Sequence, residues 1–256
     1  MRLTIGCDPE FFLLDTQLGT YVSAHNILPG TKEEPFKVDG GAVQVDGVAV
    51  EFNTDPACTA QEFAHNIRTV LGELRKMIPA KYVFDFRPAV VFEPSYFKKL
   101  PRTAVELGCT PDWNGYTFQH NPRPDGANTT MRTASGHVHI GWDRPTTEIT
   151  ENHIKECGRI ARNLDVTLGM ASLEWDRDTK RRQLYGKAGC YRPKPYGIEY
   201  RTLSNAWLKD DRLIYRVFNG AIHGVSDYFE NGVNCAFMKQ RQDVVQEAIN
   251  RGRRPE

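Results

Sequence analysis

The sequence predicts a single α+β domain over residues 1–256. Short apolar runs with strand-like alternation are interspersed with a few long amphipathic segments. No Ser/Gly-rich linker or low-complexity tract separates them. With 40% hydrophobic and 11% aromatic residues, the chain can bury a substantial core, which excludes an intrinsically disordered protein.

The helices are predicted from apolar residues that recur every three or four positions. The clearest helix begins at Thr59, which has the spacing of a capping box with Glu62, and it ends before Pro79. Three further helices are expected, over residues 150–168, 211–229 and 240–250.

Four predicted strands carry a polar pair at positions i and i+2, which point to the same face of a sheet. The pairs are Asp8 and Glu10, Glu51 and Asn53, His137 and His139, and Glu199 and Arg201. Any one pair is also what the solvent face of an antiparallel sheet shows, and for one pair taken alone that interpretation is favoured. Taken together, however, the four pairs consist mainly of carboxylates, imidazoles and a guanidinium. A solvent-exposed face of a sheet would more often carry Thr, Lys, Ser and Gln. On a common sheet, the carboxylates would repel one another unless cations lay between them.

The ligand types favour Mg²⁺ or Mn²⁺ over zinc, because carboxylates outnumber imidazoles. Two segments are strongly charged. Residues 1–60 carry nine acids and three bases, and residues 177–197 carry seven bases and one acid. Charge alone favours two solvated faces. A magnesium site beside a basic, glycine-punctuated segment is nevertheless what phosphoryl transfer from ATP requires.

Several classes of protein are not expected. The net charge of +1, from 33 basic and 32 acidic residues, gives no overall field that would recruit nucleic acid. No apolar run approaches the ~20 residues of a membrane span, and residues 1–30 lack the pattern of a signal peptide. The six cysteines lie far apart without a CxxC pair, so we interpret them as reduced thiols. These features predict a cytoplasmic protein with no membrane partner.

The order of these motifs resembles a known family. The segments that carry the likeness are GCDPEFF, DGVAVEFNTDP, SGHVHIGW, YGKAGCYR and PYGIEYRTLS. They resemble the carboxylate–amine ligases of the glutamine synthetase and glutamate–cysteine ligase superfamily, and in particular the phage phiEco32-like COOH–NH2 ligases (amidoligases) of type 2. The resemblance extends from residue 5 to about residue 230. It implies a glutamine-synthetase-like catalytic domain, with helices on one face of a curved, mainly antiparallel sheet and divalent ions and ATP on the concave face. For a phage-encoded member, the cytoplasm would be that of the host.

The resemblance also implies roles for individual residues. The matched metal ligands are Glu10, Glu51, His137, Glu199 and Asp8. Asp8 ranks below Glu10 because Pro9 fixes the backbone and removes an amide donor, which would turn Asp8 away from the metal face. Arg201 and Lys187 match catalytic cations that stabilise the transferred phosphoryl group. The nucleotide contacts match His139, Arg182, Tyr185, Lys187 and Arg192.

The implied reaction is the ATP-dependent formation of an amide or peptide bond through an acyl phosphate. The substrates would be a small-molecule, peptide or protein carboxylate and an amine, and in some members a partner glutamine amidotransferase supplies ammonia. Residues 111–136, rich in Pro, Asn, Gly and Thr, are the candidate lid. Asp46 or Asp176 could act as the base, and nothing in their spacing distinguishes them.

Two other classes of function stay open. A metal-dependent hydrolase could use the HVH strand and the carboxylates to activate water, although it would normally need more histidines and would leave the basic segment unexplained. The other class is a binding module that has the same fold but no catalytic activity. Arg201 could also be a structural partner of Glu199 or Asp8, and Lys187 an exposed turn residue. The remaining histidines are predicted to be structural or on the surface: His25, His65, His120, His153 and His223.

Overall fold

The chain passes from one antiparallel sheet into a second at Asp8 and Pro9. The computed structural model describes residues 1–105, 111–122, 129–232 and 236–254. The first sheet has the order β1 (Leu3–Cys7), β11 (Val138–Trp142), β13 (Gly197–Tyr200), β12 (Cys190–Lys194) and β9 (Trp113–Asn114). The second has the order β3 (Thr20–Val22), β2 (Glu10–Asp15), β6 (Ala49–Thr54), β5 (Gly41–Asp46) and β4 (Phe36–Val38), and β7 (Tyr82–Asp85) also pairs with β2.

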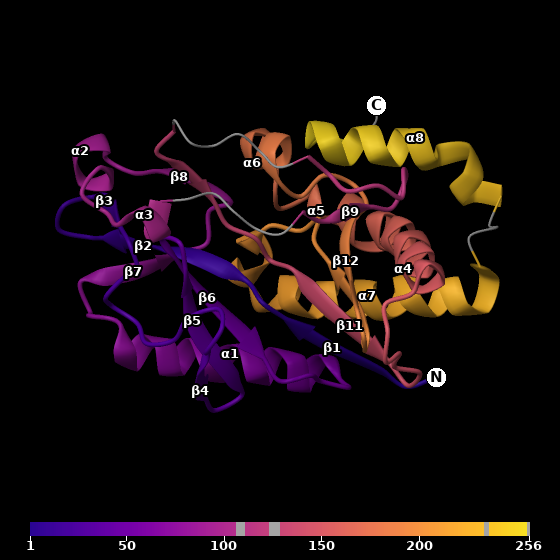
Figure 1. The fold of residues 1–256 in the computed structure, drawn as a ribbon, viewed down its shortest axis with the longest axis horizontal. Helices are drawn as coiled ribbons and strands as arrows, with labels where there is room; N and C mark the ends of the chain where they lie inside the picture. The colour runs from indigo at the N-terminus through magenta and orange to yellow at the C-terminus, as the bar shows by residue number, and fades with distance from the viewer. Residues whose placement is uncertain (106–110, 123–128, 233–235, 255–256) are drawn as a thin grey trace.

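Backbone hydrogen bonds join the two sheets into one curved surface (Figure 1). Ile5 and Ala57 exchange two hydrogen bonds of 2.8 Å, which link β1 to the segment that follows β6. The amide of Phe52 donates to the carbonyl of Pro9 at 3.2 Å, and the amide of Glu10 donates to the carbonyl of Ser135 at 2.9 Å. The predicted α+β fold with a curved, mainly antiparallel sheet is therefore confirmed.

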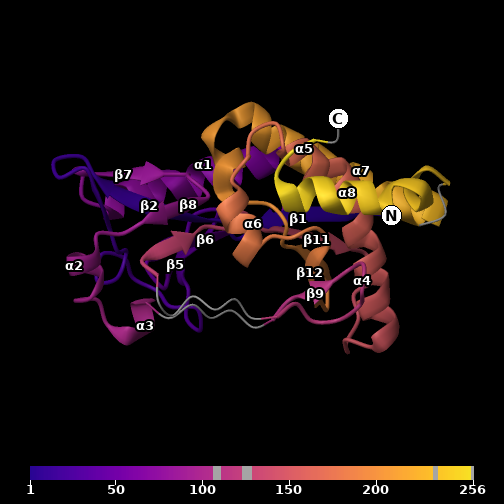
Figure 2. The same ribbon diagram turned by 90° about the horizontal axis from the view of Figure 1, so that it is seen from above.

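One face of this surface is covered by helices. The main ones are α1 (Ala60–Met77), α4 (Glu151–Leu164) and α7 (Asp211–Asn231). Helix α7 packs between the other two, and Figure 2 shows α1 and α7 on one side of strands β1, β6 and β11. Alternate residues of the strands, such as Val50, Phe52, Val138 and Ile140, are fully buried against this layer. The residues that alternate with these on the same strands point to the opposite face, where they can form a site.

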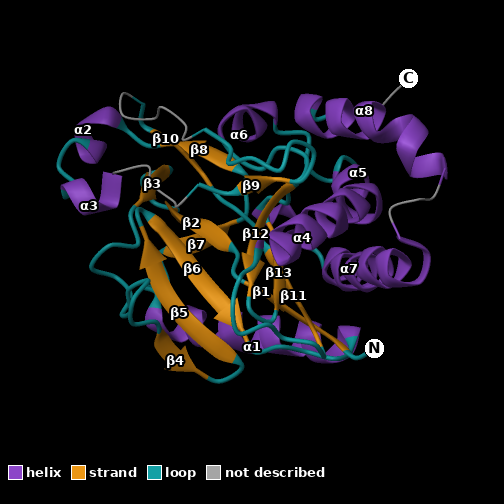
Figure 3. Cartoon of the chain, turned by 45° about the vertical axis from the view of Figure 1, so that its right-hand side comes forward, coloured by secondary structure: helices purple, strands orange, loops and turns teal. Residues whose placement is uncertain are grey.

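The predicted helices are present, with some differences at their ends. The capping box of α1 is formed, because the hydroxyl of Thr59 accepts a 3.1 Å hydrogen bond from the amide of Glu62. Helix α4 does not stop at residue 168; it continues through a π-helical turn (Asp165–Gly169) into α5 (Met170–Ser172). The predicted C-terminal helix is α8 (Ala236–Arg251), which runs beside α4 and α5 in Figure 3. The remaining short elements are α2 (Pro94–Phe97), α3 (Arg102–Val105), β8 (Ala89–Val91), β10 (Met131–Thr133) and a 3-10 helix (Asn205–Lys209).

The basic, glycine-punctuated segment and the candidate lid both contain regular structure. Residues 177–197 include α6 (Thr179–Leu184) and all of β12, because Asp178 caps the helix and β12 pairs with β13 along its length. In the candidate lid, β9 pairs with β12 and β10 pairs with β8, while residues 123–128 lie outside the described part.

Two predictions from composition were that the thiols are reduced and that the chain does not cross a membrane. Cys7, Cys58, Cys157 and Cys190 carry free thiols, and Cys109 and Cys235 lie outside the described residues. Within the described ranges, no helix combines the length and the apolar character needed to span a bilayer.

Candidate active site

A pocket of about 590 Å³ opens on the face of the sheet that the helices leave uncovered. Both sheets contribute to its lining. The residues predicted from the sequence that line it are Asp8, Glu10, Glu51, His137, His139, Arg192 and Arg201. Segments that lie far apart in the sequence therefore converge, as the four polar pairs predict.

Strand register explains this convergence. Glu10 of β2 stands opposite Glu51 of β6, and Glu51 stands opposite Gln44 of β5. In the first sheet, His139 of β11 stands opposite Glu199 of β13. Side chains at directly opposed positions on one face lie about 5 Å apart at Cβ, so each pairing creates a cluster of polar groups.

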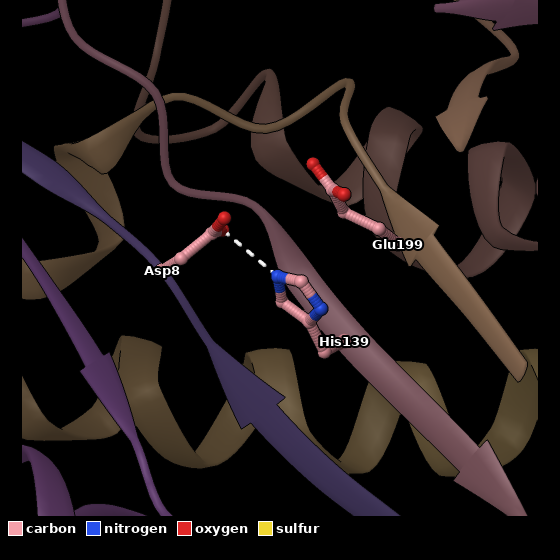
Figure 4. Close-up of side chains that lie close together, drawn as sticks. All are labelled: Asp8, His139 and Glu199. Atoms are coloured by element: carbon pink, nitrogen blue, oxygen red, sulfur yellow. Dashed lines mark ion pairs between the residues drawn. The ribbon is translucent and has the colours of Figure 1, made fainter. Parts of the chain in front are cut away.

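The first cluster consists of Asp8, His139 and Glu199, whose ligand atoms all lie within 4.8 Å of one another (Figure 4). Oδ1 of Asp8 lies 3.1 Å from Nε2 of His139. Both atoms are buried, and neither has a partner in hydrogen-bond geometry. Pro9 therefore does not turn Asp8 away from the site, because the chain bends between the two sheets and the bend points the carboxylate into the pocket. The ranking of Asp8 below Glu10 as a ligand stays a prediction, because both carboxylates line the pocket.

Glu199 is fully buried among basic side chains and is not itself among the residues that line the pocket. Its carboxylate is paired with Arg201, with Nζ of Lys194 at 2.9 Å and with Nη1 of Arg192 at 3.3 Å. Burial and the charge of Asp8 would raise the pKa of Glu199, but Arg201 and the two histidines outweigh them and hold it at about 2. The first cluster is therefore a carboxylate site with much of its negative charge already balanced.

The two histidines of β11 have different surroundings. His137 lies between Asp8 and Glu199, 3.5 Å from each, and 3.3 Å from the guanidinium of Arg201. Burial and Arg201 lower the pKa of His137 to about 4. Burial would lower the pKa of His139, but Asp8 reverses the direction and raises it. The geometry groups His139, which was predicted to contact nucleotide, with the carboxylates, whereas the role of His137 as a ligand stays a prediction.

The second cluster consists of Glu10, Asp46 and Glu51, and its ligand atoms also lie within 4.8 Å of one another. Burial, followed by the charge of Asp46, raises the pKa of Glu10 to about 7. Burial and the neighbouring acids raise the pKa of Glu51 well above its usual range, although Gln44 donates a 2.7 Å hydrogen bond to it. Nζ of Lys32, 3.7 Å from Asp46, faces this cluster. The negative charge here is much less balanced than in the first cluster.

Sequence reasoning missed several residues of the pocket. Among those that line it without having been singled out as site residues are Lys32, Gln44, Lys194 and Tyr196, and Asp46 was considered only as a base. A signal was available for three of them. Gln44 and Asp46 on β5, and Arg192 and Lys194 on β12, are same-face pairs of the kind used to find the other strands.

Other predicted residues lie elsewhere. Among the described residues, the lining of the pocket does not include Lys187, Tyr185, Arg182 or Asp176. Arg182 and Asp176 are buried together, with Nη2 and Oδ2 3.4 Å apart. The carbonyl of Lys187 accepts a 3.0 Å hydrogen bond from the hydroxyl of Thr202, and the amide of Tyr185 closes the end of α6. Their predicted roles in nucleotide binding and catalysis therefore have no support from the geometry of this pocket, and Asp46 is the better placed of the two candidate bases.

The donor set fits divalent cations that prefer oxygen. Each cluster is rich in carboxylates, and only the first contributes an imidazole. Buried ligand atoms without hydrogen bonds in the first cluster, and raised carboxylate pKa values in the second, are what a cation would relieve. Residues Asp8, His139 and Glu199 would hold one ion, and Glu10, Asp46 and Glu51 another.

Comparison with known proteins agrees with this chemistry. Residues 133–254 match the family model described as "Phage phiEco32-like COOH.NH2 ligase-type 2". The resemblance seen in the sequence is confirmed for the segments SGHVHIGW, YGKAGCYR and PYGIEYRTLS, whereas GCDPEFF and DGVAVEFNTDP lie outside the matched residues. The match covers β11, β12 and β13 with the first cluster's His139 and Glu199. The second cluster lies outside the matched residues, so its assignment rests on geometry.

A solved structure is also similar to this chain. It is described as "Crystal structure of novel glutamine synthase homolog", with a TM-score of 0.42 and 12% sequence identity. The similarity covers 98% of this chain and 64% of the other, so this chain spans less than two thirds of that protein's length. Among curated proteins, none matches the sequence.

Proposed function

We propose that the protein is an ATP- and Mg²⁺-dependent ligase that forms an amide or peptide bond through an acyl phosphate. The observation that supports this most is the meeting of two opposite kinds of group in one pocket. Carboxylates form two clusters suited to divalent cations, and Lys32, Arg192, Lys194 and Arg201 line the same space. A nucleoside triphosphate needs both, because cations must screen its phosphates while the protein anchors the metal.

The chain's own residues have distinct tasks in this proposal. The two clusters would hold the ions, which screen the negative charges of the triphosphate and the substrate carboxylate from each other. Arg201 is held in place by Glu199, His137 and Asp112, with its Nε 3.4 Å from Oδ2 of Asp112. Such a pre-oriented guanidinium stabilises charge on a phosphoryl group without needing to reorganise.

The reaction would proceed in two steps. An oxygen of the substrate carboxylate attacks the γ-phosphorus of ATP, the bond to the bridging oxygen breaks, and ADP leaves. The amine nitrogen then attacks the carbonyl carbon of the acyl phosphate, inorganic phosphate leaves, and a base takes the proton from nitrogen. One carboxylate oxygen of Asp46 would hold the second ion, and its other oxygen is our candidate for that base, since Asp46 lines the pocket and is partly exposed.

The substrates are proposed only by class. They would be a carboxylate from a small molecule, peptide or protein and an amine, with ammonia from a partner glutamine amidotransferase as one possible source. Water must stay away from the acyl phosphate, and residues 111–136 remain our candidate lid. The alternative of a hydrolase is not favoured, because His139 is the single imidazole in the two cation clusters of the described residues.

The test is a panel of carboxylates and amines, incubated with ATP and Mg²⁺ and read by mass spectrometry and ADP release. We expect ADP release that requires both Mg²⁺ and a carboxylate, with a product that has lost one water. Arg201→Ala should lower kcat by about 10²–10³-fold. The matched control is Arg212→Ala, which removes an exposed arginine paired only locally with Asp210 and should leave turnover unchanged. Zinc-dependent hydrolysis without nucleotide affinity would contradict the proposal.

A further inference from the structure

Tyr196 lies at the mouth of the pocket, in the turn between β12 and β13. This turn is fastened to the end of β11. The carbonyl of Tyr196 accepts a 3.1 Å hydrogen bond from the amide of Trp142, and the carbonyl of Pro195 accepts one of 2.7 Å from Thr146. The phenol oxygen of Tyr196 consequently lies 2.5 Å from Nδ1 of His139.

The turn can form this tightly because a glycine follows Tyr196. Gly197 has a φ of +154°, and a Cβ at this position would lie 2.1 Å from the carbonyl oxygen of Ile140. Any other residue would push the hairpin away from β11. The backbone of the turn therefore holds Tyr196 beside β11, within reach of the imidazole of His139.

The two nitrogens of His139 face different partners. Nδ1 contacts the hydroxyl of Tyr196, and Nε2 lies 3.1 Å from Oδ1 of Asp8 without hydrogen-bond geometry. A phenol can accept a hydrogen bond from Nδ1–H. An imidazole that carries its proton on Nδ1 keeps the lone pair on Nε2 for a metal, so the hydrogen bond at one nitrogen decides what the other can do.

We propose that Tyr196 is a positioning residue of the first cation cluster. Its hydroxyl accepts a hydrogen bond from Nδ1–H of His139, which fixes the ring and presents Nε2 beside Asp8 and Glu199 as a ligand atom. The proposal rests on the cation-dependent function proposed above. Partners of this kind typically change metal affinity by about 10–100-fold when they are removed.

The test is Tyr196→Phe, which removes one oxygen atom and keeps the ring. We expect calorimetric titration with Mn²⁺ to show about 10–100-fold weaker binding at one site, with binding at the second cluster retained. The matched control is Tyr21→Phe, which removes a phenol that donates to Asp85 at 2.9 Å away from the pocket and should leave both affinities unchanged. Thermal unfolding of the cation-free proteins shows whether each variant is folded.

A second measurement reports on His139 directly. Nitrogen-15 NMR of histidine-labelled, Mg²⁺-loaded protein should show His139 protonated at Nδ1 in the wild type, and a shift in its nitrogen signals in Tyr196→Phe. Equal Mn²⁺ affinity in wild type and Tyr196→Phe, with unchanged nitrogen signals, would overturn the positioning role while leaving the ligase proposal intact. Failure of the wild-type protein to bind Mn²⁺ or Mg²⁺ would overturn both.

Discussion

At the scale of single residues, the carboxylates of the second cluster repel one another. Glu51 is buried beside Glu10 and Asp46, and its one described hydrogen-bond donor is the neutral amide of Gln44. Buried groups of like charge are tolerated when a site needs them for binding. We therefore expect the cluster to lower the stability of the cation-free protein and to raise its affinity for cations.

The substitution Glu51→Gln tests both effects. We expect the free energy of unfolding of the cation-free protein to rise at pH 8, on the order of 1–3 kcal/mol, because a buried carboxyl that is costly to ionise beside Glu10 and Asp46 is removed. Cation binding at the second cluster should weaken at least about tenfold, with loss of ligase turnover. Urea unfolding and Mn²⁺ titration measure the two effects. A variant that is less stable and binds Mn²⁺ as well as the wild type would contradict this interpretation.

Prediction of site residues from the sequence depended on the resemblance to a ligase family and on one local rule, the i and i+2 pair. The rule found Glu51, His139 and Glu199, because alternation along a strand is fixed by backbone geometry. The rule did not fix the orientation of Asp8, because Asp8 lies in the bend between β1 and β2 rather than in a strand. It also gave no reason to exclude Lys187, because distance from the pocket is not visible in a local pattern.

At the scale of elements, the start of α1 depends on a small number of hydrogen bonds. Thr59 accepts from the amide of Glu62, and the carboxylate of Glu62 accepts from the amide of Cys58 at 2.8 Å. We expect Thr59→Ala to lower the free energy of unfolding by about 1 kcal/mol. Cation affinity should not change, because α1 packs on the face of the sheet opposite the pocket. A destabilisation below about 0.3 kcal/mol in urea unfolding would show that the cap is not needed.

The π-helical turn after α4 is tied to the sheet by the fully buried Asp165. Its carboxylate accepts hydrogen bonds from the hydroxyls of Tyr200 at 2.6 Å and Tyr116 at 2.8 Å. Burial, only partly offset by these hydrogen bonds, raises the pKa of Asp165 from 3.8 to about 6. The folded state thus binds this proton more tightly than the unfolded state. The resulting stabilisation is fully present below about pH 4 and is lost as the pH rises through 6.

Asp165→Asn isolates this pH dependence. The free energy of unfolding of the wild type minus that of the variant should fall by about 2.5 kcal/mol between pH 4 and pH 7, because the variant has no proton to lose. Urea unfolding over this pH range measures the difference. Parallel stability curves for the two proteins would show that Asp165 titrates alike in the folded and unfolded states.

At the scale of the whole molecule, the pocket spans the junction between the two sheets. The first cluster draws on β11, β13 and the bend after β1, and the second on β2, β5 and β6. Ions bound to both clusters would therefore add a further link between the two sheets. Without the ions, the sheets are held together by backbone hydrogen bonds and the hydrophobic core.

Adding Mg²⁺ should stabilise the entire fold. At a concentration of about 100 times Kd, one bound ion adds about 2.7 kcal/mol to the free energy of unfolding. For a chain of this length, that corresponds to a rise in Tm of roughly 5–10 °C, which EDTA should reverse. Differential scanning calorimetry measures the shift, and Glu51→Gln should show a smaller one. A Tm that does not respond to Mg²⁺ or Mn²⁺ would argue against both cation clusters.

The sequence by itself determined the helices, the alternation of the strands and the chemical type of the site. These follow from local periodicity, and local periodicity is set by the geometry of each element. Only the tertiary structure decided which strands stand opposite each other. It bent the chain at Pro9 so that Asp8 meets His139, it set Asp46 beside Glu10 and Glu51, and it left Lys187 outside the pocket. Such pairings join residues far apart in the chain, and their register depends on packing that no short window of sequence contains.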